Sequence, residues 1–155
     1  MSRPPFQTVL DAHAGDVYRL LVAAVGPVDA DDCWQETFLS ALRAYPRLES
    51  ADNLRGWVLT IAHRKALDLH RRTARGPLPV ATVPDRSAGG QPDGDPMLWR
   101  MVRSLPPKQR AAILYRYVND LPYRDIGALI GSTADAARRS VHDGLKKLRE
   151  EYDHD

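Results

Sequence analysis

The residue types that most often carry chemistry are sparse in this chain of 155 residues. Its five histidines are scattered, at His13, His63, His70, His142 and His154. The sequence contains no HExxH pair, no glycine-rich phosphate loop and no nucleophile elbow. Cys33 is the only cysteine, which excludes an internal disulfide and a cysteine-built zinc site, and we expect an inert, partly buried thiol. The pattern argues against an enzyme or a metal protein, and we expect no cofactor.

Charged side chains are the abundant functional groups, and their distribution is uneven. Lys and Arg number 22 against 20 Asp and Glu, for a net charge of +2. Residues 29–36 hold four carboxylates and no cation, whereas residues 64–72 hold four cations against Asp68 alone. An acidic face and separate basic faces suit a protein that binds nucleic acid with one surface and another protein with a different surface.

The acidic segment 29–46, DADDCWQETFLSALRAYP, contains one residue that does not fit a simple surface helix. At about 100° per residue its apolar side chains form one stripe, made of Trp34, Phe38, Ala41, Leu42 and Tyr45. The opposite side is polar, with Asp32, Gln35, Glu36 and Arg43, yet Leu39 falls among them. Such a leucine is either an isolated exposed side chain, which is common on protein surfaces, or the apolar centre of a docking patch.

The elements that would carry these residues are helices. Helical spacing of apolar residues runs over residues 6–24 and stops at Gly26-Pro27. The acidic segment forms a second helix that ends at Pro46, and residues 53–72 form a third. Its inner face is expected to hold Val58, Ile61, Ala62, Ala66 and Leu69.

A compositional break follows these helices. Residues 73–96 contain five Pro and four Gly and show no hydrophobic periodicity, which indicates a flexible linker. A structureless stretch of that length is unusual inside one compact domain. We therefore expect an all-α protein with two small helical domains, residues 1–72 and 97–155, joined by the linker 73–96.

The second half ends in a predicted helix-turn-helix. An apolar helix over residues 111–118 precedes it, Pro122 opens the next helix, and Gly131 closes that helix. Ser132 is the expected cap of the last helix, with Asp135 completing a weak capping box. The last helix has an apolar side, made of Ala137, Val141, Leu145 and Leu148, and a charged side, made of Asp135, Arg138, Arg139, His142, Lys146 and Arg149. This pattern is typical of a recognition helix that enters the major groove, the alternative being an exposed charged helix.

Taken together, these segments resemble a known family. The acidic segment followed by NLRGWVLTIAHRKALDLHRRTAR is similar to region 2 of the extracytoplasmic-function sigma factors of bacterial RNA polymerase. LPPKQRAAILYRYVNDLPYRDIGALIGS through LKKLRE resembles their region 4. The likeness covers about residues 6–72 and 97–150. It implies a protein without chemistry of its own that binds core RNA polymerase, recognises the promoter −35 and −10 elements and assists strand opening.

The resemblance also implies roles for individual residues. In the family the QETFL helix docks on the clamp helices of the polymerase largest subunit, which assigns core-polymerase binding to Asp32, Gln35, Glu36, Leu39 and Arg43. A flipped base of the −10 element would enter a pocket made by Ser50, Asp52 and Asn53. Contacts to the −10 strand or backbone would come from Arg55, Trp57, His63, Arg64, Arg71 and Arg72. The −35 element would be read through Ser132, Thr133, Arg138, Arg139, His142 and Lys146.

Several alternatives stay open at this point. Trp57 fits equally well as a ring packed in the crevice between helices. Asp143 stands where family members often have a basic residue, and Gly144 lowers helix propensity by about 1 kcal/mol. The chain could therefore be a sigma-like regulator without promoter activity, or a helix-turn-helix repressor or activator that acts on duplex DNA without polymerase.

The resemblance and the sequence also set expectations for partners and location. An anti-sigma factor is the further partner that the family implies. No signal-peptide core and no apolar run long enough for a membrane span is present in the sequence, so we expect a cytoplasmic protein without membrane insertion.

Overall fold

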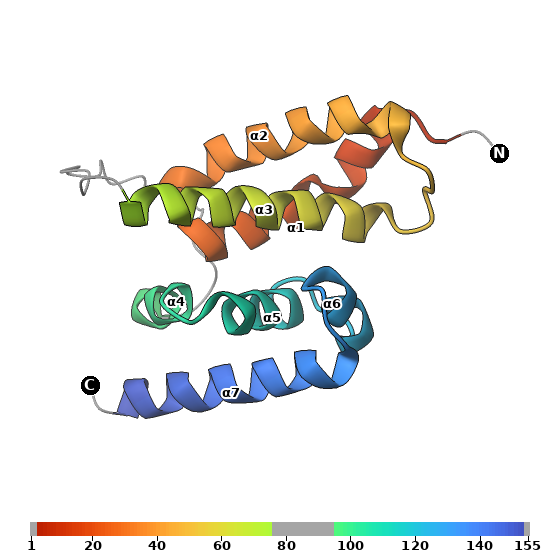
Figure 1. Ribbon diagram of the computed structural model, residues 1–155. Coiled ribbons are helices and arrows are strands. Elements are labelled where there is room, and N and C mark those ends of the chain that lie inside the picture. Colours follow the sequence, from red (N-terminus) through yellow and green to blue (C-terminus); the bar gives the residue numbers. More distant parts are fainter. Residues whose placement is uncertain (1–2, 76–94, 154–155) are drawn as a thin grey trace. The chain divides into compact units, whose positions relative to one another are not determined.

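The computed structural model describes residues 3–75 and 95–153, and every regular element in these two ranges is a helix (Figure 1). The chain divides into two compact units, one within residues 1–90 and the other within residues 91–155. The all-α prediction is confirmed. Residues 76–94 of the predicted linker lie outside the described residues. No helix of the described part is both long enough and apolar enough to span a membrane.

The first unit is a bundle of three helices in which each helix packs against the other two (Figure 1). They are α1 (Phe6–Val25), α2 (Pro27–Ala44) and α3 (Leu54–Arg75), and the short 3-10 helix η1 (Tyr45–Arg47) follows α2. Pro27 begins α2 because the first helical position needs no backbone N–H donor. The predicted helices are confirmed, except that α3 continues past the predicted end at Arg72.

The core of this unit differs from the predicted apolar stripe on α2. Phe38, Ala41 and Tyr45 are buried as expected, but Leu42 is 50% exposed. Three small side chains that the stripe left out, Ala30, Cys33 and Thr37, are buried instead. They rotate the buried face of α2 away from Leu42, so its assignment to the core was wrong.

Two polar contacts tie α3 to α1. Near the start of α3, the Asp16 carboxylate accepts hydrogen bonds from Arg55 Nε at 2.6 Å and from Arg19 Nη2 at 2.7 Å. Near its end, His70 Nε2 lies 2.9 Å from the carbonyl oxygen of Ala24. These contacts fix the register of the helix that carries most of the basic residues of the unit.

The second unit contains four helices, of which α7 packs against the other three. They are α4 (Pro96–Arg103), α5 (Pro107–Tyr117), α6 (Tyr123–Leu129) and α7 (Ala134–Asp153). The short α4 was not predicted. Asp95 caps it by accepting a hydrogen bond from the Met97 amide at 2.9 Å, and the buried Arg110 donates to the Arg103 carbonyl at 2.9 Å. These side chains satisfy backbone groups at the two ends of this short helix.

Helices α6 and α7 form the predicted helix-turn-helix. Gly131 adopts a φ of 71° in the turn, a left-handed conformation that glycine reaches without strain. The cap of α7 is one residue later than predicted, because Thr133 Oγ1, and not Ser132, accepts the hydrogen bond from the Ala136 amide, at 3.1 Å. Ser132 instead donates its amide to the Gly127 carbonyl at 2.7 Å.

Gly144 has a packing role that the sequence did not reveal. It is buried where α7 crosses α5, and a Cβ atom there would lie 2.5 Å from Ile113 Cδ1. The missing side chain at residue 144 therefore leaves room for the end of the Ile113 side chain. A low helix propensity at this site is the cost of that contact, so Gly144 is no evidence for a weakened recognition helix.

Gly127→Ala should strongly destabilise the second unit. A Cβ atom at residue 127 would lie 2.5 Å from the backbone carbon of Thr133 and 2.9 Å from the Ala134 amide nitrogen, so the turn itself would have to move. We expect a loss of about 2 kcal/mol or more in urea unfolding followed by circular dichroism. The matched change Gly15→Ala, at an exposed position of α1, should be neutral or stabilising. Equal effects of the two changes would contradict this account.

The Asp16 contacts should contribute stability that disappears in acid. Burial raises the pKa of Asp16, but the hydrogen bonds and charges of Arg55 and Arg19 outweigh this effect and hold the pKa below its ordinary value. The unfolded chain then binds more protons as the pH falls, so the contribution is complete above about pH 4 and is lost as the pH drops through the folded-state pKa.

We therefore expect Asp16→Asn to lower the free energy of unfolding by about 1 kcal/mol at pH 7, since solvent screens the partly exposed Arg55. The difference from the parent should shrink toward zero in strong acid. Fluorescence-detected urea unfolding in a Trp99→Phe background reports on the first unit alone, because the remaining tryptophans are Trp34 and Trp57. Asp11→Asn, on the exposed side of α1, is the control, and a pH-independent difference for Asp16→Asn would refute the linkage.

Candidate functional site

The outer side of α2 exposes apolar area inside a charged ring. Leu39 is 51% exposed and Leu42, three residues on, is 50% exposed. Around them lie the exposed side chains of Asp32, Gln35, Glu36 and Arg43. We call these six residues the α2 docking face. Two adjacent exposed leucines are more than a stray side chain, and a ring of charges around apolar area is the usual anatomy of a protein-binding patch.

The acidic part of the docking face lies beside the basic end of α3. Asp32 and Glu36 line a hollow of about 390 Å³ together with Leu69 and Arg72, and a second hollow of about 370 Å³ is lined by Glu36, Lys65, Asp68, Arg71 and Arg72. The sequence placed acidic and basic groups on different faces. In the structure these groups adjoin along the groove between α2 and α3.

Cys33 borders the same hollow but is chemically quiet. Its side chain is 4% exposed, and burial, together with the nearby Glu36 and Asp29 carboxylates, raises the pKa of the thiol to about 11. A thiolate is therefore scarce at neutral pH, as expected for an inert cysteine.

The loop before α3 has its own internal hydrogen bonds. Ser50 Oγ accepts from the Asp52 amide at 3.2 Å, and Asn53 Oδ1 accepts from the Gly56 amide at 3.0 Å, which caps α3. Ser50, Asp52 and Asn53 are all exposed, so the loop presents three polar side chains in a defined conformation. Asn53 has a structural role in addition to the one predicted for it.

Two residues predicted to touch DNA are held by the protein instead of projecting freely. Arg55 is bound to Asp16, as described above. The ring of Trp57 is partly buried and its centroid lies 6.0 Å from that of Tyr45, which in turn makes an edge contact with Phe6. This aromatic cluster favours the packing alternative for Trp57.

The remaining predicted contacts on α3 are more accessible. Arg64, Arg71 and Arg72 are exposed, and Arg71 lies 3.8 Å from Asp68 on its own helix. His63 is half-buried. The exposed arginines place positive charge along the later part of the helix, where a phosphate backbone could run.

In the second unit, the predicted contact residues share the outer side of α7. Arg138, Arg139, His142 and Lys146 are exposed, while Ala137, Val141 and Leu148 are buried against the rest of the unit. Thr133 is exposed and Ser132 half-buried in the turn. Asp143 is exposed beside His142 and adds one negative charge to this face. The geometry is that of a helix-turn-helix whose second helix can lie in a major groove.

The Tyr123 ring lies beside two arginines, Arg116 and Arg138, a contact that the sequence did not predict. The Cζ atom of Arg138 lies 4.9 Å from the centroid of the Tyr123 ring on α6, and the Cζ atom of Arg116 lies 4.4 Å from the same centroid. Arg116 is on α5, and its Nη1 donates to the Leu121 carbonyl at 3.0 Å. No period in the sequence brings residues 116, 123 and 138 together, because three different helices supply them.

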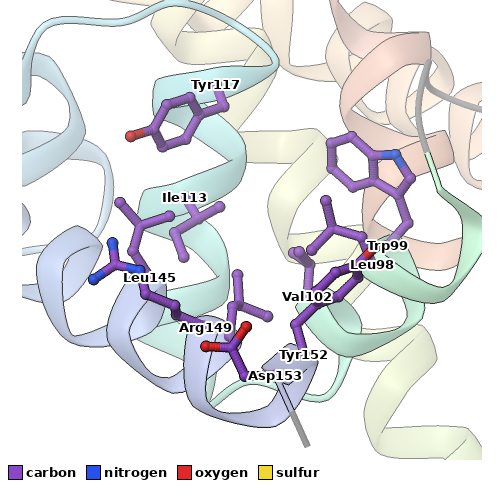
Figure 2. A pocket seen from close by; sticks show the side chains of 10 residues that line it. Leu98, Trp99, Val102, Ile113, Tyr117, Leu145, Arg149, Tyr152 and Asp153 are labelled. Atoms are coloured by element: carbon purple, nitrogen blue, oxygen red, sulfur yellow. The ribbon is translucent and has the colours of Figure 1, made fainter. Parts of the chain in front are cut away.

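An apolar groove runs between α4, α5 and α7. Figure 2 shows Trp99, Leu98 and Val102 of α4 on one side and Ile113 and Leu145 on the other. Its volume is about 520 Å³, and Tyr117, Leu148, Arg149, Tyr152 and Asp153 complete its lining. The groove was not predicted, because α4 was not predicted and Leu145 was placed only on the apolar side of the last helix.

The described residues contain no cluster of three or more His, Cys, Asp or Glu side chains that could hold a metal ion. The faces described above consist of charge, hydrogen-bonding groups and apolar area.

Comparison with known families divides the chain at the same place as the fold. The Sigma-70 region 2 family matches residues 9–76, and the Sigma-70, region 4 family matches residues 96–148. The first match spans α1 to α3, and the second spans α4 to α6 and most of α7.

Individual proteins are similar over nearly the whole chain. The ECF RNA polymerase sigma factor SigE of Mycolicibacterium smegmatis is 30% identical over 95% of this chain, which spans 61% of the length of that protein. RNA polymerase sigma factor CarQ of Myxococcus xanthus is 31% identical over 94% of this chain and 87% of its own length.

Two solved structures share the fold. The sigma factor RpoE, in complex with the anti-sigma factor NepR from Bartonella quintana, gives a TM-score of 0.73 at 21% identity and covers 94% of both chains. CnrH, in complex with the cytosolic domain of CnrY, gives 0.74 at 20% identity and covers 97% of this chain and 88% of its own. With region 2 in its first unit and region 4 in its second, the chain belongs to the extracytoplasmic-function sigma factors, which direct promoter-specific transcription initiation.

Proposed function

We propose that the α2 docking face binds the clamp helices of core RNA polymerase, while α3 and α7 bind the −10 and −35 elements of a promoter. The observation that carries this proposal is the exposed pair Leu39 and Leu42 inside a ring of charged side chains. Leucine supplies area that loses water on docking, and the charges set orientation and encounter rate. A regulator that acts on duplex DNA alone has no need of such a face.

For the −10 element, we assign base capture to the loop with Ser50, Asp52 and Asn53 and backbone contact to Arg64, Arg71 and Arg72. Opening a duplex costs stacking energy, which flipped bases held in a pocket and cations on the backbone can offset. The hydrogen bonds inside the loop support this role because a preorganised loop loses little entropy when it binds. Arg55 and Trp57, which contact Asp16 and Tyr45, then support α3 more than they touch DNA, whereas His63 keeps its predicted DNA contact.

The adjoining hollows suggest that polymerase and promoter meet along one edge. Glu36 belongs to the docking face, and Arg72 to the proposed DNA contacts, yet both line the same hollow. Binding of one partner therefore changes the electrostatic field that the other partner experiences. The protein acts without chemistry of its own, in the cytoplasm where bacterial RNA polymerase works.

We further propose an anti-sigma factor as a regulatory partner. Both solved relatives described above were determined with such a partner, or with its cytosolic domain in the case of CnrH. The apolar groove of the second unit offers a surface for an amphipathic helix of that partner, with Arg149 and Asp153 at its edge as charged guides.

Individual residues decide how far the alternative functions are supported. Gly144, which suggested a weakened recognition helix, is explained by its contact with Ile113. Asp143 remains the one departure that favours a sigma-like regulator without promoter activity. A repressor acting alone would bind duplex DNA without core polymerase, which a gel-shift comparison with and without core enzyme distinguishes.

Leu39→Asp and Leu42→Asp should each weaken binding to core RNA polymerase by about tenfold or more, because a buried carboxylate replaces apolar contact area. Run-off transcription with core enzyme should fall in parallel. Co-purification with core polymerase measures the affinity, and far-UV circular dichroism checks the fold.

The matched control is Ala12→Asp, which adds the same charge to an exposed position of α1. It should leave core binding unchanged. If Leu39→Asp and Ala12→Asp behave alike, α2 is not the docking surface.

Arg138→Ala should reduce promoter affinity by about 1–3 kcal/mol and relax the preference at one base position of the −35 element if the guanidinium reads a guanine edge. If it holds a phosphate, the slope of log affinity against log salt should instead drop by about 1. Titrations of holoenzyme on a promoter located by transcript sequencing measure both. Lys147→Ala, on the same helix but outside the assigned set, is the control, and no change in either quantity would remove Arg138 from the interface.

A further inference from the structure

The side chain of Arg138 has a fixed place on the free protein. Its Cζ atom lies 4.9 Å from the centroid of the Tyr123 ring, and its Nη1 donates to Asp135 Oδ1 at 2.9 Å. At 59% exposure the side chain is held yet remains open to solvent. The contact with Tyr123 crosses from the first helix of the helix-turn-helix to the second, so it links the direction of Arg138 to the frame of the motif.

The Tyr123 ring is itself held in place by α5. Arg116 lies 4.4 Å from the ring centroid, and its guanidinium is fixed by the hydrogen bond to the Leu121 carbonyl. Tyr123 is the first residue of α6, directly after Pro122, whose φ is restricted. The ring position is thus set by the protein alone, before any DNA is present.

A guanidinium offers a face and an edge for different partners. An aromatic ring takes the face, through attraction between the cation and the π system, and leaves the N–H donors on the edge. Asp135 uses one donor nitrogen of that edge in the free protein. An Arg side chain has many rotamers, so a ring that already orders it lowers the entropic cost of forming a bidentate bond to a base.

We propose that Tyr123 is a positioning residue for −35 recognition: its ring orients the Arg138 guanidinium so that the edge faces a guanine in the major groove. This inference rests on the proposed function, in which Arg138 reads the −35 element. It adds a residue from the first helix of the motif to the specificity apparatus, although that residue need not touch a base.

The test is a selection with holoenzyme, formed from the full chain and core polymerase, on a pool of duplexes randomised over the −35 element. Arg138→Ala should lose roughly tenfold of the preference at one base position. Tyr123→Leu should lose about threefold at that same position, in keeping with a cation–π contact at an exposed site. Tyr123→Phe keeps the ring and should retain the parental preference.

The double variant Tyr123→Leu/Arg138→Ala separates positioning from a general effect. If Tyr123 acts through Arg138, the double variant should match Arg138→Ala alone. Two outcomes would overturn the inference while leaving Arg138 as a reader of DNA. In one, the double variant loses threefold more base preference than Arg138→Ala alone. In the other, Tyr123→Leu keeps the parental base preference. Parental preference in Arg138→Ala would overturn both assignments.

A second measurement needs no DNA. In the NMR spectrum of the free chain, the δ protons of Arg138 should be shifted upfield by the Tyr123 ring, should keep that shift in Tyr123→Phe and should lose it in Tyr123→Leu. Absence of the shift in the parent would overturn the contact itself. Because this readout is independent of polymerase and promoter, it separates a failed positioning contact from a failed promoter assignment.

Discussion

The exposed face of α2 depends on how that helix is buried. Ala30, Cys33, Thr37 and Ala41 turn a side of small residues toward α1 and α3, which allows the three helices to pack closely. A helix has only one opposite side, so this choice places Leu39 and Leu42 together at the surface. The same constraint operates in the second unit, where Gly144 leaves room for Ile113 of α5 and the charged side of α7 faces outward.

Much of the fold could be predicted from the sequence, because long amphipathic helices show a helical spacing of apolar residues and have Pro or Gly at their ends. The helix bounds of α1, α2 and α6 agree with prediction to within one or two residues. The short α4 was not predicted because its eight residues make barely two turns, and the contacts of Asp95 and the buried Arg110 at its ends are tertiary or capping contacts. The N-cap of α7 at Thr133 was not predicted, because its neighbour Ser132 is an equally good capping residue.

The binding surfaces were less readable than the helices. The residue pattern of one helix predicts exposed cations such as Arg64 and Arg72. It cannot predict the partners of Arg55 and Trp57, because these partners lie on other helices. The exposure of Leu42 likewise required knowledge of which small residues α2 buries. Contacts that join three helices, such as the one around Tyr123, follow only from the tertiary structure.

The buried thiol of Cys33 has a consequence for the folded protein as a whole. The thiol has a pKa of about 11 and almost no contact with solvent, so it is a poor nucleophile. Peroxide and alkylating reagents attack thiolates, so Cys33 of the native protein reacts poorly with both.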